Sequence, residues 1–177
     1  MEIRKLATSY KEAIVAAAVE RIGSLSMRYV TGRPDLGQSK EHGYDCSGFV
    51  RQVLLHAGLH IPDYIGMDDE RRPIRHASEF WDHYGIHASS EPEAGDLIFF
   101  SRHGLMPTHI GIVRDEESYI HAPGQDNTEV TIDTITHQDI TPRQIGSRVL
   151  YQVNPIGFKA PTIPLPTPTY RYHQQLA

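Results

Sequence analysis

The sequence holds a single cysteine, Cys46, and its surroundings indicate a reactive thiol at the start of a helix. Asp45, directly before it, is a favoured N-cap residue, because a short carboxylate can accept hydrogen bonds from the free amides of a first turn. Apolar residues then recur at one-face helical spacing from Phe49 to Ala57, until Gly58 predicts the end of the helix. The positive end of a helix dipole favours a thiolate, so we expect the pKa of Cys46 to be lowered. Taken alone, Cys46 leaves open the alternative of an inert, small, buried side chain.

Two histidines downstream offer the base and the orienting group that a nucleophilic thiol needs. His109 and His121 lie in short runs of β-branched and aromatic residues, and the polar stretch 114–117 between the runs predicts a hairpin. Their offset is even, so a hairpin centred on Asp115 would make them direct cross-strand partners on one face. One ring would then accept the thiol proton while the other ring fixes its tautomer and orientation.

Two further pairs of histidines are spaced as metal ligands on a helix would be. These pairs are His56 with His60 and His83 with His87. Gly58 and Gly85 fall inside the pairs and are expected to end the helices there, so the paired side chains should not share a face. The sequence also lacks a second cysteine and an HExxH pattern. We therefore expect neither a metal site nor a cofactor.

The N-terminal part of the chain predicts an amphipathic helix. Ser9 and Glu12 form a capping-box pattern, and the helix is expected to run to about Arg21 and to end at Gly23. The apolar stretch 13–19 is short, alanine-rich and flanked by charged residues, so we read it as part of this helix and not as a signal peptide. No stretch of the sequence approaches ~18 apolar residues, and we expect no membrane span.

The second half of the chain predicts strands. Its β-branched and aromatic runs are Leu97–Ser101, His109–Arg114, Ser118–His121, Val130–Ile135 and Arg148–Val153. A helical half, including an expected helix at 77–84, followed by an antiparallel half predicts an α+β fold. Arg71 and Arg72 stand beside an acidic run and are interpreted as a solvated loop.

Length and charge restrict the organisation further. A chain of 177 residues predicts one domain, which we place at residues 1–158. Prolines interrupt the remainder, so residues 159–177 are interpreted as an extended proline-rich tail. A net charge of −5 gives no electrostatic reason to expect nucleic acid. We expect a monomer.

A set of motifs, in this order along the chain, resembles the signature of the NlpC/P60 cysteine peptidases. The motifs are Asp45–Val50 (DCSGFV), Gly95–Phe100 (GDLIFF), His109–Val113 (HIGIV) and Tyr119–Ala122 (YIHA). Upstream, Tyr29 to Gly32 is similar to the Tyr-x-x-Gly segment that precedes the nucleophile in that family. The resemblance extends over about residues 10–155.

This resemblance implies a papain-like fold with N-terminal helices packed on a central antiparallel sheet. It implies Cys46 as the nucleophile, His109 as the general base and acid, and His121 as the residue that orients His109. Tyr29 matches the family tyrosine whose hydroxyl lies near the nucleophile and can assist the oxyanion.

The resemblance also implies a substrate, namely a stem peptide or muropeptide of bacterial peptidoglycan, cut between D-γ-glutamyl and a diamino acid. Asp45 and Ser47, on either side of the thiol, resemble substrate-contacting positions, while a helix-capping role stays open for both. An amidase or acyltransferase using the same thiol is one alternative, and a non-catalytic binding module is another. Family members are usually secreted or associated with the cell wall, whereas we expect no signal peptide in this sequence.

Overall fold

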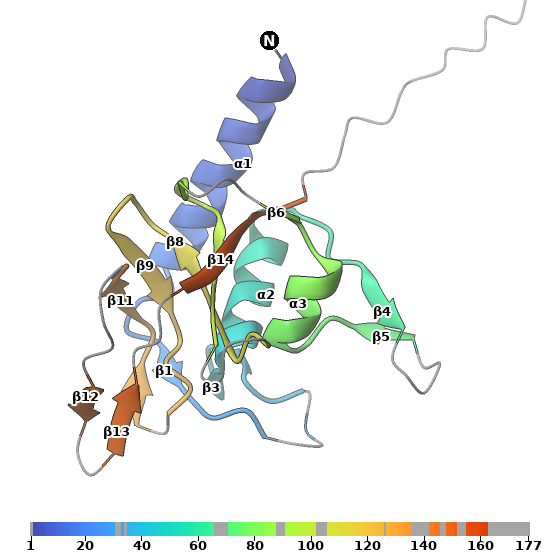
Figure 1. Ribbon diagram of the computed structural model, residues 1–177. Coiled ribbons are helices and arrows are strands. Elements are labelled where there is room, and N and C mark those ends of the chain that lie inside the picture. The colour runs from blue at the N-terminus through green and yellow to red at the C-terminus, as the bar shows by residue number, and fades with distance from the viewer. Residues whose placement is uncertain are drawn as a thin grey trace, which may run out of the picture.

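A six-stranded antiparallel sheet forms the centre of the protein, as seen in a computed structural model (Figure 1). The structure describes residues 2–30, 33, 35–65, 71–87, 91–101, 106–125, 127–135, 142–145, 148–151 and 155–162. The strand order is β11-β9-β8-β7-β14-β6. The strands are β6 (Ile86–His87), β7 (Leu97–Phe100), β8 (His109–Val113), β9 (Ser118–His121), β11 (Thr131–Thr134) and β14 (Pro155–Ala160). Together with the helices, this sheet confirms the expected α+β class.

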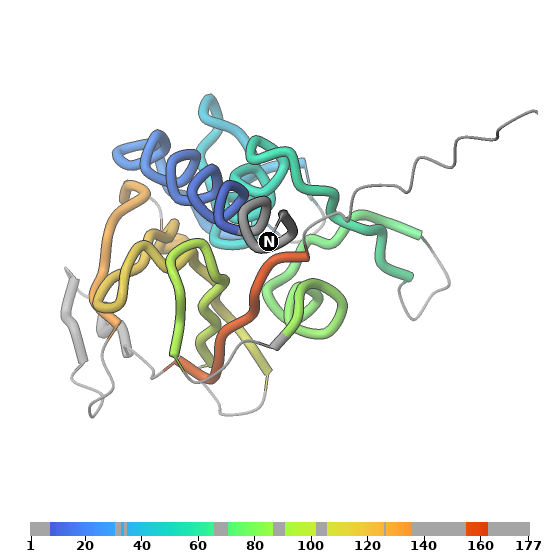
Figure 2. The backbone as a smooth tube through the Cα atoms, turned by 90° about the horizontal axis from the view of Figure 1, so that it is seen from above, coloured from blue at the N-terminus to red at the C-terminus, as the bar shows by residue number. Residues whose placement is uncertain are grey.

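Two helices, α1 (Glu2–Val19) and α2 (Cys46–His56), pack on each other and cover one face of this sheet (Figure 2). A third helix, α3 (Ala77–His83), lies beside β14 (Figure 1). The predicted helix ends at Gly58 and Gly85 are confirmed, because both glycines follow a helix and have φ angles of 79° and 77°.

The predicted start of α1 at Ser9 is wrong, because the helix begins at Glu2. The residues before Ser9 include no glycine or proline, so nothing in the sequence stops the helix from continuing towards the N-terminus. Ser9 therefore lies inside the helix, and its capping-box pattern with Glu12 does not mark a helix start.

Alternate residues of the central strands belong to two apolar clusters. The cluster shared with the helices includes Leu97, Phe99, Ile110, Ile112 and Ile120. The second cluster consists of Ile98, Phe100, Val113, Tyr119, Ile135 and Phe158. Because successive side chains of a strand point to opposite faces, the sheet buries apolar groups on both sides.

The turn before β7 holds α1 in place. Nζ of Lys11 lies 2.9 Å from Oδ1 of Asp96, a side chain that is almost fully buried. Gly95 has a φ of 89°, and a Cβ atom there would lie 3.0 Å from the Cα atom of Lys11. The Gly-Asp pair of the sequence motif therefore serves as the docking point of a helix.

Smaller sheets surround this core. A four-stranded sheet, ordered β10-β1-β3-β2, is formed by β1 (Leu25–Ser26), β2 (Gln38–Ser39), β3 (Gly43–Tyr44) and β10 (Thr128–Glu129). Two hairpins are formed by β4 (Asp63–Ile65) with β5 (Arg71–Pro73), and by β12 (Pro142–Ile145) with β13 (Arg148–Tyr151).

The interpretation of Arg71 and Arg72 as a solvated loop is wrong, because both belong to β5 and pair with β4. The two strands of this hairpin have three residues each, too few for an alternating pattern to be visible in the sequence. The hairpin projects from the body of the protein beside α3 (Figure 1).

The C-terminal strand β14 was missed, and it runs across the predicted boundary at residue 158. Lys159 pairs with Leu97 of β7, and Ala160 pairs with Ile86 of β6. The sheet therefore takes in two residues that the sequence assigned to the tail, and residues from 163 onward lie outside the described part of the chain. Among the described helices, none combines the length and the apolar character that crossing a bilayer requires.

Candidate active site

The hairpin of β8 and β9 forms, but its register differs from the predicted one. Ile112 pairs with Ile120, and the backbone N–H of Arg114 donates to the carbonyl of Ser118 over 2.9 Å, so the hairpin is centred one residue beyond Asp115. Direct pairing of the two histidines is therefore wrong. The reason lies in the turn, where Oδ1 of Asp115 accepts a hydrogen bond of 2.7 Å from the Ser118 hydroxyl and stabilises a three-residue loop. Moving the centre by one residue shifts each cross-strand partner by two residues, which is an even number, so both histidines stay on the same face of the sheet.

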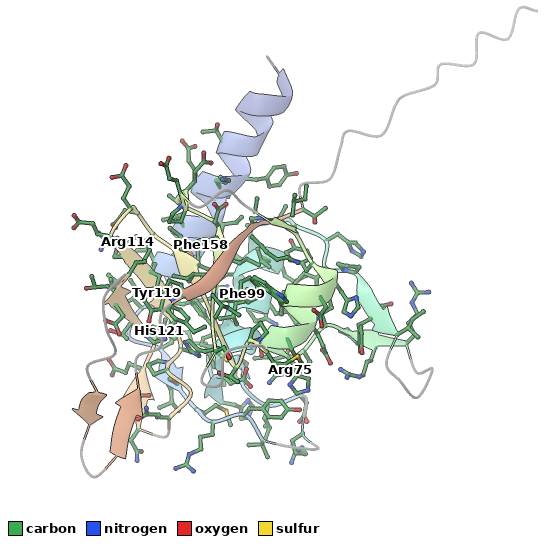
Figure 3. The ribbon with its side chains drawn as sticks, viewed as in Figure 1. Arg75, Phe99, Arg114, Tyr119, His121 and Phe158 are labelled. Carbon is green, nitrogen blue, oxygen red and sulfur yellow. The ribbon has the colours of Figure 1, made fainter. Side chains whose placement is uncertain are left out.

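The two histidines are in direct contact across the hairpin. Nε2 of His109 lies 2.7 Å from Nδ1 of His121, and the ring centroids are 4.9 Å apart. A Cβ atom on Gly111 would lie 3.2 Å from Cβ of His121, so the missing side chain of Gly111 leaves the space that His121 occupies. The ring of His121 also packs on the ring of Tyr119, with 4.8 Å between centroids, and both residues lie along β9 (Figure 3). The structure thus brings together the predicted base and its predicted orienting residue.

Burial sets the charge of His121. Its side chain is largely inaccessible to solvent, and burial lowers the pKa of His121 to about 4. The imidazole is therefore neutral near pH 7 and can hold the neighbouring ring by a hydrogen bond without competing for a positive charge.

Cys46 is the first residue of α2, as predicted, and is half-buried. Asp45 caps this helix, and its Oδ1 accepts a hydrogen bond of 2.8 Å from the backbone N–H of Gly48. Backbone hydrogen bonds from Ile110 and Ser47 reach the thiol. Because Ile110 follows His109 directly, the thiol lies next to the beginning of β8.

The expectation of a lowered thiol pKa is wrong, because burial raises the pKa of Cys46 to about 11. The negative charge of Asp45 adds to the effect of burial, while the two backbone hydrogen bonds and the charge of Arg75 oppose it. The helix dipole alone favours a thiolate, but the N-cap residue Asp45 is itself a carboxylate, and its negative charge disfavours a second negative charge on the thiol. The resting thiol is consequently protonated near pH 7.

Asp45 and Ser47 belong to a buried ion-pair network. Both oxygens of Asp45, a residue only 1% exposed, accept hydrogen bonds from Arg75, one of 2.8 Å from Nη1 and a shorter one from Nη2. The Ser47 hydroxyl accepts a hydrogen bond of 2.9 Å from Nη1 of Arg75 and lies 3.3 Å from Oδ1 of Asp45. The capping role of Asp45 is thus visible in the structure, and substrate contact by either residue stays a prediction.

Arg75 is the residue that sequence reasoning missed. It is 4% exposed, and its Nη2 also donates to the carbonyl of Leu36 over 2.8 Å. Arg75 stands 30 residues from Asp45, so no local spacing in the sequence indicates their contact. In Figure 3, Arg75 lies at the end of α3, towards the same end of the molecule as His121.

The contacts of Tyr29 lead to the same network. Its hydroxyl lies 3.4 Å from Nε2 of His76, and the two ring centroids are 4.8 Å apart. Cζ of Arg75 lies 5.0 Å from the centroid of the Tyr29 ring. Tyr29 is 37% exposed, so its hydroxyl is placed beside the network and within reach of solvent.

Two of the histidines with metal-like spacing make other contacts. His56 lies 3.6 Å from a carboxylate oxygen of Glu20, and the ring of His83 packs on Tyr64 with 4.5 Å between centroids. Within the ranges that the structure describes, no three histidine, cysteine or carboxylate side chains come together as metal ligands would.

The same arrangement of helices and sheet occurs in solved structures. A Staphylococcus aureus Mu50 protein described as similar to lipoprotein, of the NLP/P60 family, has a TM-score of 0.56 and 24% identity over 88% of this chain and 42% of its own. The peptidoglycan hydrolase RipB of Mycobacterium tuberculosis has a TM-score of 0.54 and 24% identity over 75% of this chain and 62% of its own. At these identities the likeness concerns the fold.

The sequence comparison is more specific. The profile of the NlpC/P60 family matches residues 29–149, and the chain belongs to this family. The NlpC/P60 domain of the peptidoglycan hydrolase SagA is 31% identical over 71% of this chain and 89% of its own, with a TM-score of 0.50. The probable peptidoglycan endopeptidase LytE of Bacillus subtilis (strain 168) is 27% identical over 114 residues, 63% of this chain. That match spans only 28% of the length of LytE.

Proposed function

We propose that this protein is a cysteine endopeptidase that hydrolyses amide bonds in bacterial cell-wall peptides, between D-γ-glutamyl and a diamino acid. Membership of the NlpC/P60 family and the likeness to named peptidoglycan hydrolases support the substrate class. The observation that carries the proposal is the 2.7 Å contact between His109 and His121 at the strand whose backbone hydrogen bonds to the Cys46 thiol.

The first step is attack by the thiol. His109 engages His121 through Nε2, so Nδ1 is the nitrogen that exchanges a proton with Cys46. Because the pKa of the resting thiol is about 11, His109 removes the proton as Sγ attacks the carbonyl carbon, and no preformed thiolate is needed. The lowered pKa of His121 keeps the new positive charge on His109.

The tetrahedral intermediate then collapses. Its oxyanion is stabilised by the backbone N–H of Cys46 with help from the hydroxyl of Tyr29, and a donor of this kind is worth ~2.7–4 kcal/mol where measured. His109 returns its proton to the departing amine of the diamino acid, which leaves a thioester on Cys46. A water molecule, deprotonated by His109, hydrolyses the thioester and releases the D-γ-glutamyl carboxylate.

Incubation with defined peptides tests the proposal. Purified protein should release a free diamino acid end from a γ-D-glutamyl-diamino-acid peptide, detected by mass spectrometry of the products, and Cys46→Ala should abolish the release. Equal cleavage by both proteins would refute Cys46 as the nucleophile. An added amine or alcohol distinguishes hydrolysis from acyl transfer, because a transferase would attach the glutamyl group to the added acceptor.

A further inference from the structure

One guanidinium group joins segments of the chain that are far apart in sequence. Arg75 donates to the carbonyl of Leu36, to both oxygens of Asp45 and to the hydroxyl of Ser47, and it lies over the ring of Tyr29. The residue is 4% exposed, so these contacts are made away from solvent. A planar fork with five N–H donors suits this set of acceptors, whereas an ammonium group cannot reach them all.

The acceptors of Arg75 flank the proposed nucleophile. Asp45 and Ser47 are the neighbours of Cys46 in sequence, and Asp45 also caps the first turn of α2 through Gly48. Tyr29 comes from a separate segment, between β1 and β2. Arg75 therefore contacts the side chains on either side of Cys46 and the ring of Tyr29, the two residues that the proposed mechanism assigns to the oxyanion.

The backbone of Arg75 is held from a second side. Oε2 of Glu79 accepts hydrogen bonds of 2.8 Å from the N–H of Arg75 and 3.1 Å from the N–H of His76. Oε1 of Glu79 accepts a hydrogen bond of 2.6 Å from Nη2 of Arg72, a residue of β5. The loop that carries Arg75 is thereby tied to α3 and to the projecting hairpin of β4 and β5.

We propose that Arg75 is a positioning residue, which fixes the first turn of α2, with Cys46 at its start, relative to Tyr29. For the reaction itself, this inference rests on the proposed peptidase function. Arg75 also pairs the charge of Asp45, so the thiol is next to an ion pair and not next to an unpaired carboxylate. His109, at the start of β8, directly precedes Ile110, whose backbone hydrogen bonds to the thiol.

Two substitutions of Arg75 separate its shape from its charge. Arg75→Lys keeps the charge and loses the fork, so we expect kcat to fall on the order of tenfold, as misplacement of reacting groups does, with KM nearly unchanged. Arg75→Met removes the charge as well, so we expect the pH midpoint of Cys46 alkylation by iodoacetamide to move up, because the charge of Asp45 is then unpaired. The alkylation needs no substrate and therefore tests Arg75 even if the protein cleaves no muropeptide.

A double variant and a matched control complete the experiment. Arg75→Met with Asp45→Asn removes both charges, so the alkylation midpoint should move back down while kcat stays low. Arg71→Met removes an exposed arginine of the neighbouring hairpin, which pairs with Asp63 at the surface, and should leave kcat and the midpoint unchanged. Circular dichroism identifies folded variants, and if Arg75→Met does not fold, Arg75→Lys decides. Wild-type kcat in Arg75→Lys, or a wild-type midpoint in folded Arg75→Met, would overturn the proposal.

Discussion

His121 is a titratable residue that the fold keeps neutral. The residue is 8% exposed, and its ring contacts His109 and packs on Tyr119. Burial lowers the pKa of His121 from an ordinary value of 6.5 to about 4. The neutral ring suits a group whose proposed task is to hold a neighbouring imidazole.

The stability of the protein should therefore fall on acidification. Between pH 6.5 and about 4 the unfolded chain binds a proton at His121 that the folded protein does not, so stability decreases as the pH falls through this window and is unaffected above it. The total loss is on the order of 3 kcal/mol. The free energies of unfolding measured with urea at pH 7.5 and pH 4.5 should differ by most of this loss.

The matched comparison is His121→Gln, which cannot titrate. Protonation of carboxylates with a lowered pKa, such as Glu79 and Asp115, destabilises both proteins at low pH. The difference between the two pH dependences of stability therefore isolates the contribution of His121. Identical pH dependences would contradict a buried neutral imidazole at this position.

For single residues, the sequence predicted correctly which side chains share a strand face, but it did not predict the pKa of the thiol. The even offset of His109 and His121 places both rings on one face, because alternation along a strand is a local property. The thiol pKa depends on burial and on Asp45 and Arg75, and Arg75 comes from 30 residues away. No pattern around Cys46 carries that information.

Within the hairpin of β8 and β9, the absence of a side chain at Gly111 is a packing requirement. A Cβ atom there would lie 2.9 Å from Cδ2 of Tyr119 and 3.2 Å from Cβ of His121. Gly111→Ala should therefore displace the His121 ring, lower kcat at least tenfold and destabilise the protein by about 1–3 kcal/mol, the usual range for overpacking. Thermal unfolding and muropeptide cleavage measure the two effects.

Gly58→Ala is the control for this substitution. Gly58 has a φ of 79° and nothing within 4 Å of its added Cβ, so alanine costs stability only through backbone strain of about 1 kcal/mol. Its kcat should equal that of the wild type. Equal kcat in Gly111→Ala would show that His121 is not held by this close approach.

The docking of α1 depends on the ion pair of Lys11 and Asp96. Lys11→Met leaves a buried carboxylate without its cation, so we expect a loss of roughly 3 kcal/mol in the free energy of unfolding. Adding Asp96→Asn should restore part of the loss, because the uncompensated charge is removed. Urea titration measures both, and Lys40→Met, at an exposed lysine, is the control. A loss no larger than that of the control would contradict the role of this pair.

Strands with a clear run of β-branched or aromatic residues were predictable, and strands without such a run were not. β7, β8, β9 and β11 each have a run of β-branched or aromatic residues long enough to identify a strand. β14 lacks that pattern, because it contains Pro155 and Gly157 and its register shifts between them. Gly157 is explained only by tertiary packing, since a Cβ atom there would lie 2.8 Å from Cη2 of Trp81.

For the molecule as a whole, the C-terminal limit of the domain can be tested by truncation. A chain ending at Thr162 keeps all of β14 and the 3.2 Å hydrogen bond from Gly85 to the Thr162 hydroxyl, so we expect it to unfold at the temperature of the full chain. A chain ending at Phe158 loses the pairs of Lys159 and Ala160 with β6 and should unfold several degrees lower. Calorimetry of the two proteins compares them, and equal midpoints would place the limit at the boundary predicted from the sequence.

The place of β14 between β7 and β6 has a kinetic consequence. β7, β8 and β9 are close in sequence and can associate early, whereas the partner on the other side of β7 arrives from about 60 residues downstream. Until that long loop closes, a partly assembled sheet presents the bare amides and carbonyls of β7 to any other chain nearby. Self-association during refolding should therefore begin at β7. Any change that makes residues 155–160 pair with β7 sooner should reduce it.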